Sequence, residues 1–208
     1  IRAISSGTIL PNSKELKFNF EAINIREVEV RIIKIYEDNV LQFLQENRIN
    51  SNNQYNIRRV GRTIAKKKLT LIDKKENNTQ TWKAYSVDIS KMIATEPGAI
   101  YRVELSYEKE QTFFNCADNN SDNSLEEEQY FDEQDEDIKE ELYWDNKLYR
   151  YRNYSYNWRE RDNPCNAAYY NEDRIVAQNV LASNLGIIAK KGESNTYFFA
   201  ITNILNTN

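Results

Sequence analysis

The residues that could carry chemistry gather in one acidic segment. Residues 117–145 hold thirteen carboxylates and a single base, Lys139. Two carboxylates can serve acid–base catalysis when a cleft holds them about 5–10 Å apart. Adjacent acids in a low-complexity run are not held at such separations, so we do not assign catalysis to them. The chain also lacks histidine, which removes the usual general base and the commonest zinc ligand.

Calcium is the metal that suits such a segment, because it takes several carboxylate and carbonyl oxygens. The stretch from Asp118 has the outline of an EF-hand loop but departs from it twice. Its sixth residue is Asn123 where glycine makes the turn, and its twelfth is Gln129 where glutamate closes the site. A solvated loop is the alternative. We predict neither a dedicated metal site nor a cofactor.

Two cysteines flank the acidic segment, Cys116 just before it and Cys165 some way after it. They are too few for a structural zinc site. A disulfide between them would close the base of the segment and would fit an oxidising compartment, whereas two free thiols are the alternative. The sequence has no Gly-x-Ser-x-Gly motif, and its five glycines offer little material for a phosphate loop. We therefore predict that the chain is not an enzyme.

Aromatic and basic residues alternate after the acidic segment. The aromatic residues are Tyr149, Tyr151, Tyr154, Tyr156 and Trp158, and Arg150, Arg152, Arg159 and Arg161 lie among them. Such rings bury large areas when covered, which argues against a fully solvated loop. We predict an insertion over residues 115–170 that folds back on itself or on the basic residues 58–68. The five aromatic residues either pack within the module or bind a partner.

The charge is unevenly distributed along the chain. Residues 117–145 carry −12 and the whole chain −4, so the remainder carries +8. Its basic residues cluster at Arg58, Arg59, Arg62, Lys66, Lys67, Lys68, Lys74 and Lys75. No recognition helix, zinc finger or RNP pattern accompanies this cluster, so we do not predict nucleic-acid binding. No apolar run approaches the roughly 20 residues of a membrane helix, so we predict no membrane contact by this segment.

Apolar residues alternate with polar ones over most of the chain. The predicted inward sets are Leu16, Phe18 and Phe20; Val28, Val30 and Ile32; Ile64, Leu69 and Leu71; and Ala99, Tyr101, Val103, Leu105 and Tyr107. The doubled Ile32–Ile33 predicts a bulge that shifts the inward positions to Ile33 and Ile35. Residues 40–44 have helical spacing behind Asp38 or Asn39 as a cap.

Short strands with frequent turns are typical of an antiparallel β-sandwich of about seven strands. Residues 1–114 supply about six strands and residues 171–190 the seventh, so the insertion precedes the last strand. We predict one all-β domain over residues 1–190, interrupted by the insertion 115–170. Residues 191–208, which follow a turn at Gly192, form an edge strand or the start of the next module.

Several stretches, in this order along the chain, resemble a macroglobulin-type module of bacterial α2-macroglobulin-like proteins. The opening "SSGTILPNSKELKFNF" has the Leu-Pro break of the family's first strand, and Asn24, Val28 and Val30 match an Asn-x-x-x-Val-x-Val pattern. "EPGAIYRVEL" resembles its Pro-Gly-x-Tyr strand with one residue extra. The tail "LASNLGIIAKKGESNTYFFAITNILNTN" is similar to the segment that ends one such module and opens the next.

The resemblance implies a macroglobulin-like sandwich, related to the immunoglobulin fold, and a non-catalytic module of a large bacterial envelope protein. Some family members entrap proteases, so neighbouring modules and proteases are the implied partners, in the periplasm or at the cell surface. The family's reactive Cys-Gly-Glu-Gln thioester is not matched by "NCADN" or "PCNAA". The alternative function is a β-sandwich binding module whose insertion recognises a glycan or a protein. The chain begins at Ile1 and stops after an apolar run, which suggests a piece of a larger protein.

Overall fold

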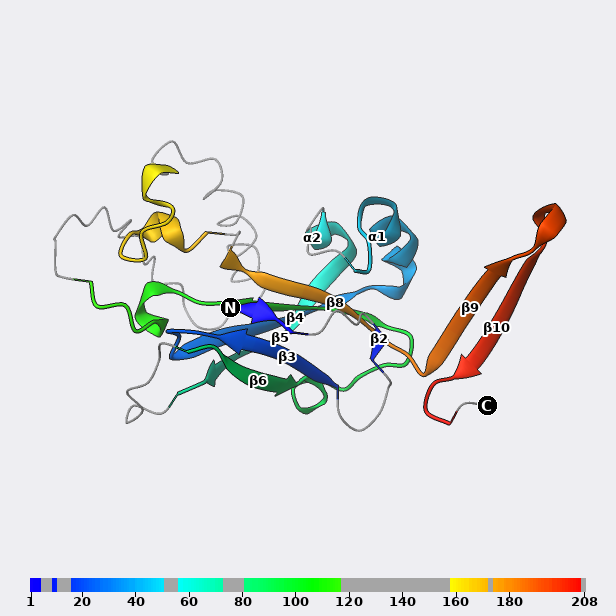
Figure 1. Ribbon diagram of the computed structural model, residues 1–208, viewed down its shortest axis with the longest axis horizontal. Coiled ribbons are helices and arrows are strands. Elements are labelled where there is room, and N and C mark those ends of the chain that lie inside the picture. Colours follow the sequence, from blue (N-terminus) through cyan, green and yellow to red (C-terminus); the bar gives the residue numbers. More distant parts are fainter. Residues whose placement is uncertain are drawn as a thin grey trace.

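Two β-sheets lie face to face in the computed structural model of the chain, which describes residues 1–4, 9–10, 16–50, 56–72, 81–116, 158–171 and 174–206 (Figure 1). The smaller sheet has the order β1 (Arg2–Ala3), β3 (Lys17–Ala22), β6 (Lys83–Asp88), and the larger has the order β2 (Ile9–Leu10), β8 (Val176–Ala182), β7 (Ile100–Ser106), β4 (Glu27–Ile35), β5 (Gly61–Thr70). Neighbouring strands are antiparallel except for the short β2–β8 pair. The predicted antiparallel β-sandwich is confirmed.

The main hydrophobic core fills the space between the two sheets. Its buried members include Phe18, Phe20 and Ala22 from β3, Val28, Val30 and Ile32 from β4, and Tyr101, Val103 and Leu105 from β7. Every second residue of each strand points into it, because successive side chains of a strand face opposite sides. Leu16, Ala99 and Tyr107 also pack there, so the inward faces predicted for these three stretches are confirmed.

Strand β4 packs into two cores and lies beside a bulge in β5. The register of β4 with β5 shifts between Ile32 and Ile33, where β5 has one extra residue, but the register of β4 with β7 is regular there. The predicted shift of the inward positions to Ile33 and Ile35 is therefore wrong: Ile32 points into the main core, whereas Ile33 and Ile35 lie in a second core on the outer face of the larger sheet. Ordinary alternation along β4 places these neighbours on opposite faces, so β4 packs against the smaller sheet on one side and against helices on the other.

Two short helices cover this second core, α1 (Val40–Glu46) and α2 (Ile57–Val60) (Figure 1). The predicted helix at residues 40–44 is confirmed, and Phe43 is its buried residue. Leu41, by contrast, is 79% exposed. The predicted side-chain cap is wrong: Asn39 is the residue before α1, but its amide donates to the Val60 carbonyl oxygen at 3.5 Å. The Asn39 side chain thus links the start of α1 to the last residue of α2 instead of capping α1.

The predicted inward position of Ile64 is also wrong. Ile64 is 42% exposed, whereas Leu69 and Leu71 pack against the main core as predicted. In the ladder, Ala65 faces Ile32 and Thr63 faces Ile33, which leaves Ile64 unpaired at the bulge. Ile64 is therefore the extra residue of a bulge in β5, and its side chain lies outside the core.

The insertion connects two adjacent strands of the larger sheet. β7 and β8 pair antiparallel with each other, and the chain between them includes the predicted insertion. Three short 3-10 helices mark its two ends: η3 (Lys109–Gln111), η4 (Trp158–Glu160) and η5 (Ala167–Tyr169). The acidic segment 117–145 lies outside the described residues, and so do the predictions that concern its fold and its partners.

Asp88 fixes the corner where β6 ends. Its Oδ1 accepts hydrogen bonds from the Leu16 amide at 3.2 Å, the Ser90 amide at 3.2 Å and the Ser90 hydroxyl at 2.6 Å. Its buried Oδ2 accepts no hydrogen bond, and the Lys91 ammonium is 3.6 Å away. One carboxylate thus begins η2 (Ile89–Lys91) and joins β6 to the start of β3.

Substitution of Asp88 by alanine is expected to lower the free energy of unfolding by about 2 kcal/mol. The Ser90 hydroxyl is the main cause that holds the pKa of Asp88 below its ordinary value of 3.8, although burial opposes it. The stabilising contribution is therefore complete above the unfolded pKa and is lost as pH falls through the folded pKa. Urea unfolding at pH 7 and at about pH 3 should show a smaller difference between wild type and D88A at the lower pH. An unchanged difference would contradict this role.

Candidate functional site

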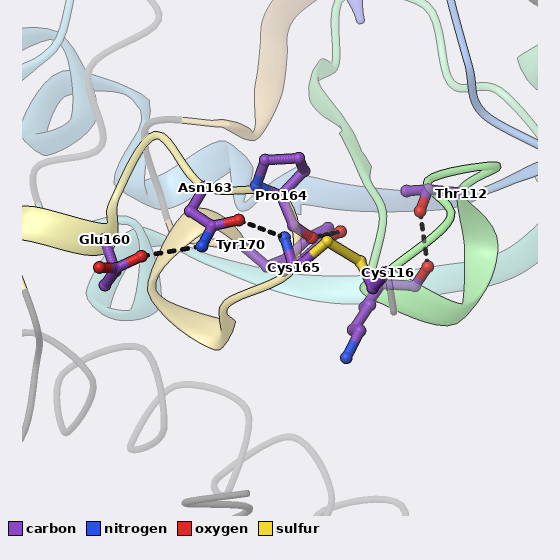
Figure 2. Close-up of a disulfide and its surroundings, with 8 residues drawn as sticks. Thr112, Cys116, Glu160, Asn163, Pro164, Cys165 and Tyr170 are labelled. Carbon is purple, nitrogen blue, oxygen red and sulfur yellow. Dashed lines mark hydrogen bonds between the residues drawn. A yellow bond between two sulfur atoms is a disulfide. The ribbon is translucent and has the colours of Figure 1, made fainter. Parts of the chain in front are cut away.

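A disulfide joins Cys116 to Cys165, with Cα atoms 5.5 Å apart and a sequence separation of 49 (Figure 2). The predicted pairing is confirmed, and the alternative of two free thiols is wrong. The chain beside Cys165 is folded tightly: the Cys165 amide donates to Asn163 Oδ1 at 3.0 Å, and the Tyr170 hydroxyl donates to the Pro164 carbonyl at 2.6 Å. The two ends of the insertion are thereby held together.

Aromatic rings pack the base of the insertion against the sandwich. Tyr170 meets Tyr107, the residue after β7, edge to face at 5.9 Å, and Tyr169 meets Phe114 in the same way at 6.1 Å. The Arg174 guanidinium lies 4.2 Å from the Tyr169 ring centroid. Burial is the main cause that raises the pKa of the Tyr107 hydroxyl. These contacts anchor both ends of the insertion beside the edge of the sandwich.

Of the five aromatic residues predicted to bind a partner, Trp158 alone lies within the described residues. Tyr149, Tyr151, Tyr154 and Tyr156 lie outside them. The Trp158 indole is 62% exposed, and the Arg161 guanidinium lies 4.0 Å from the ring centroid. Partner binding by these residues stays a prediction.

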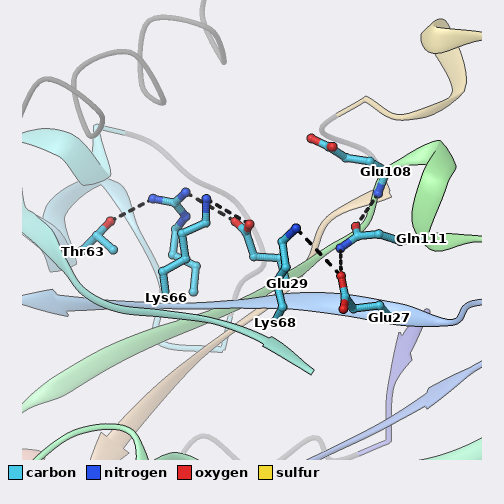
Figure 3. A network of polar contacts seen from close by, with 8 residues as sticks. Glu27, Glu29, Thr63, Lys66, Lys68, Glu108 and Gln111 are labelled. Atoms are coloured by element: carbon cyan, nitrogen blue, oxygen red, sulfur yellow. Dashed lines mark hydrogen bonds and ion pairs between the residues drawn. The ribbon is translucent and has the colours of Figure 1, made fainter. Parts of the chain in front are cut away.

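The basic residues of β5 contact carboxylates of the neighbouring strand (Figure 3). Lys66 lies 3.0 Å from a Glu29 oxygen, and Lys68 lies 4.0 Å from a Glu27 oxygen. Gln111 extends the row, since its amide donates to Glu27 at 2.9 Å. Exposed pairs of this kind each contribute about 0–1 kcal/mol. They show that part of the basic cluster is already paired within its own sheet.

A buried ion pair lies on the same outer face of the larger sheet. Arg102 and Glu104 are alternate residues of β7, 0% and 2% exposed, and their Nε and Oε1 atoms are 2.8 Å apart. Arg102 also donates to Asn179 on β8 at 3.3 Å, and the Asn179 amide donates to the Arg48 carbonyl at 3.3 Å. Two strands and the chain after α1 are therefore joined by one polar network.

Within the described ranges, no group of three or more cysteine, aspartate or glutamate residues is placed to hold a metal ion. The same part of the chain contains no helix that is long and apolar enough to cross a membrane.

A hairpin projects away from the sandwich (Figure 1). It consists of β9 (Leu185–Lys191) and β10 (Tyr197–Asn203), which pair with each other over their full lengths. Its large exposed apolar residues are Leu185, Ile187, Ile188, Tyr197, Phe198, Phe199 and Ile201, each at least 56% exposed. A contiguous apolar surface on a protein usually marks an interaction site, so we take this hairpin as the candidate functional site.

Both faces of the hairpin are apolar, but they differ. The pairing register places Leu185, Ile187, Ala189, Lys191, Tyr197, Phe199, Ile201 and Asn203 on one face, which we call the broad face. The Tyr197 and Phe199 rings stack there at 6.5 Å. The opposite face carries Gly186, Ile188, Lys190, Phe198, Ala200 and Thr202. Each face has one lysine, but the broad face has five large apolar side chains and the opposite face two, so the broad face is more suited to burial in a core.

The turn of the hairpin is built for these two strands. Ser194 and Asn195 both have positive φ angles, 58° and 57°, as the type I′ turn that matches strand twist requires. Gly192 leaves room for two neighbouring side chains, because a Cβ atom there would lie 2.7 Å from the Thr196 hydroxyl oxygen and 3.1 Å from the Phe198 ring, and both would have to shift. Sequence alternation predicted strands on both sides of Gly192, but it carried no signal that they would pair outside the sandwich.

Comparison with known proteins gives a structural likeness alone. No protein-family model and no curated protein sequence matches the chain. The fold is similar to a crystal structure of native α2-macroglobulin from Escherichia coli that spans domains NIE–MG1. The TM-score is 0.54 at 10% sequence identity, and the match covers 99% of this chain and 70% of that chain.

A second crystal structure of the same E. coli protein, spanning domains MG0–NIE–MG1, is similar over 99% of this chain and 45% of that chain. Its TM-score is 0.50 at 12% identity. The resemblance predicted from sequence motifs therefore has a structural counterpart over nearly the whole chain. At these identities the likeness concerns the fold.

Proposed function

We propose that this chain is a non-catalytic structural module of a large bacterial α2-macroglobulin-like envelope protein that entraps or inhibits proteases. Its partners are the neighbouring modules of the same protein and, through the assembly, proteases. Two independent lines support this function. The fold is similar to a two-domain part of an α2-macroglobulin, and the sequence motifs of such modules occur in the expected order.

The residues of the matched sequence motifs form a turn and part of the main core. Pro97 and Gly98 form the turn before β7, where Gly98 has a φ of 85° that disfavours other residues. Tyr101 points into the main core, and its hydroxyl accepts a hydrogen bond from the Glu96 amide at 2.9 Å. Val28 and Val30 face the same core from β4. The disulfide supports an extracytoplasmic location, since such bonds persist in oxidising compartments.

The exposed apolar hairpin carries the proposal. A single two-stranded hairpin is marginally stable in water, and β9–β10 has apolar residues on both faces. Such a hairpin needs further strands to pair with its edges and cover its broad face. We assign that role to the next module of the same polypeptide, so that β9 and β10 are its first two strands. The prediction that residues 191–208 open a following module is thereby extended to the whole hairpin.

Ile187 and Ile188 provide a matched test. They are adjacent, 65% and 67% exposed, and lie on opposite faces. In this chain alone both asparagine substitutions should leave stability unchanged. In the full-length parent, I187N should destabilise the module that follows by about 2–5 kcal/mol, because it removes a core side chain, and I188N should cost less. Amide hydrogen exchange of residues 185–203 should be fast in the chain alone and strongly protected in the parent.

Equal exchange in the two proteins, or equal effects of the two substitutions, would contradict the role of the hairpin. The protease function has its own readout. A protease mixed with the parent should lose activity on a large protein substrate but keep activity on a small peptide, because entrapment blocks access rather than chemistry. Full activity on both substrates would exclude entrapment while leaving the structural role intact.

A further inference from the structure

A cavity of about 320 Å³ opens at one end of the sandwich, beside the base of the insertion. It is lined by Asn24, Trp82, Tyr107, Phe114, Tyr169 and Arg174, among others. These residues come from five parts of the chain, and the Cys116–Cys165 disulfide ties the segment of Phe114 to that of Tyr169. Its volume lies at the lower end of the range of small-molecule sites.

The walls of the cavity are aromatic and aliphatic, since Ile1, Ile23, Ile25 and Val176 line it together with the four aromatic residues, and the aromatic walls are held in place. Phe114 and Tyr169 pack edge to face at 6.1 Å, and Tyr107 is partly buried against the main core. Asn24 turns the chain between β3 and β4 with a φ of 56°. The geometry therefore does not depend on a single flexible loop. Walls of this kind favour a planar or branched apolar group.

Two arginines border this aromatic cavity. Arg174 lines it, lies 4.2 Å from the Tyr169 ring centroid, and is 3.2 Å from an Asp162 oxygen. Arg2 lies 4.4 Å from the ring centroid of Trp82, another wall residue, and is ion-paired with Glu21. The Asp162 side chain is 77% exposed, so its ion pair contributes about 0–1 kcal/mol. Arg174 can exchange this carboxylate for that of a ligand at little cost.

We propose that the cavity binds a carboxylate that carries an aromatic or branched aliphatic body, as the C-terminal residue of a peptide does. The aromatic walls receive the apolar body, and Arg174 pairs with the carboxylate, for which its planar fork is suited. This binding function is separate from the proposed structural role.

N-acetylphenylalanine and its primary amide are matched probes, because they differ only in the carboxylate. Titration of the oxidised chain, followed through the Trp82 indole resonance, should show the acid binding about tenfold more tightly than the amide, because only the acid can form a charge-assisted hydrogen bond with Arg174. Arg174→Gln should abolish that preference while retaining weak binding of both probes.

Arg26→Gln is the control, because the Arg26 guanidinium also stacks on a ring, that of Phe113 at 4.9 Å, outside the residues that line the cavity. This variant should keep the tenfold preference. The proposal is overturned if acid and amide bind equally, if R174Q retains the preference, or if neither probe shifts the Trp82 resonance at millimolar concentration. R174Q should keep the wild-type melting temperature, which shows that the variant is folded. Substitution of Arg174 by lysine restores the positive charge and should recover part of the preference for the acid.

Discussion

Substitution of Glu104 by alanine is expected to reduce the free energy of unfolding by about 3–5 kcal/mol, because it leaves a buried guanidinium without this carboxylate. Arg102 is fully buried, and its Nε lies 2.8 Å from Glu104. A charge in such a site cannot regain water when its partner is removed. The loss is a large part of the 5–15 kcal/mol that stabilises a typical domain. Urea unfolding of the variant measures it directly.

The double variant Arg102→Met/Glu104→Leu separates the cost of an uncompensated charge from the value of the pair. Apolar residues of similar volume often replace a buried ion pair at little cost. We therefore expect the double variant to be more stable than E104A alone. Glu104→Gln, which keeps the shape and one acceptor oxygen, should fall between wild type and E104A. A loss below about 1 kcal/mol for E104A would mean that water reaches Arg102.

The Arg102–Glu104 pair also shows a structural feature that the sequence did not predict, the burial of the outer face of β7. In β7, Arg102 and Glu104 alternate with Tyr101, Val103 and Leu105, a pattern that is typical of one buried and one solvated face. The inward residues were correctly predicted for this reason. The outer face is buried as well at Arg102 and Glu104, and the Arg48 carbonyl, distant in sequence, joins the same network through Asn179. Alternation within one strand carries no information about such long-range contacts.

The hairpin illustrates the same limit at the level of strands. The residues of β9 and β10 were predictable as strands from their composition and from the turn at Gly192. Their partners were not, since an apolar strand fits an edge of the sandwich as well as a separate hairpin. The pairing register settles this, because β9 pairs with β10 along its whole length. The doubled Ile32–Ile33 is informative in another way, because two adjacent apolar residues of a regular strand face opposite sides and so indicate that β4 is buried on both faces.

Removal of the disulfide is the second change with a large expected effect. Replacement of both Cys116 and Cys165 by serine should lower the free energy of unfolding by about 4 kcal/mol, which is the loop-closure entropy for a separation of 49 residues. Aromatic contacts still hold the two ends of the insertion together, Tyr107 with Tyr170 and Phe114 with Tyr169. The free energy of the native state therefore changes less than that of the unfolded state. Urea unfolding of oxidised wild type and of the double serine variant measures the difference.

Loop length offers a test of this cause. If residues 118–157 are replaced by a short linker that leaves a closed loop of about ten residues, the same pair of serine substitutions should cost about 3 kcal/mol instead of about 4. Reduced wild type should unfold like the double serine variant, and reductant should not affect that variant. A cost independent of loop length would place the effect in the native state, in the packing of Phe114 against Tyr169. In that case breaking the bond should also abolish the aromatic cavity, which the Trp82 resonance would report.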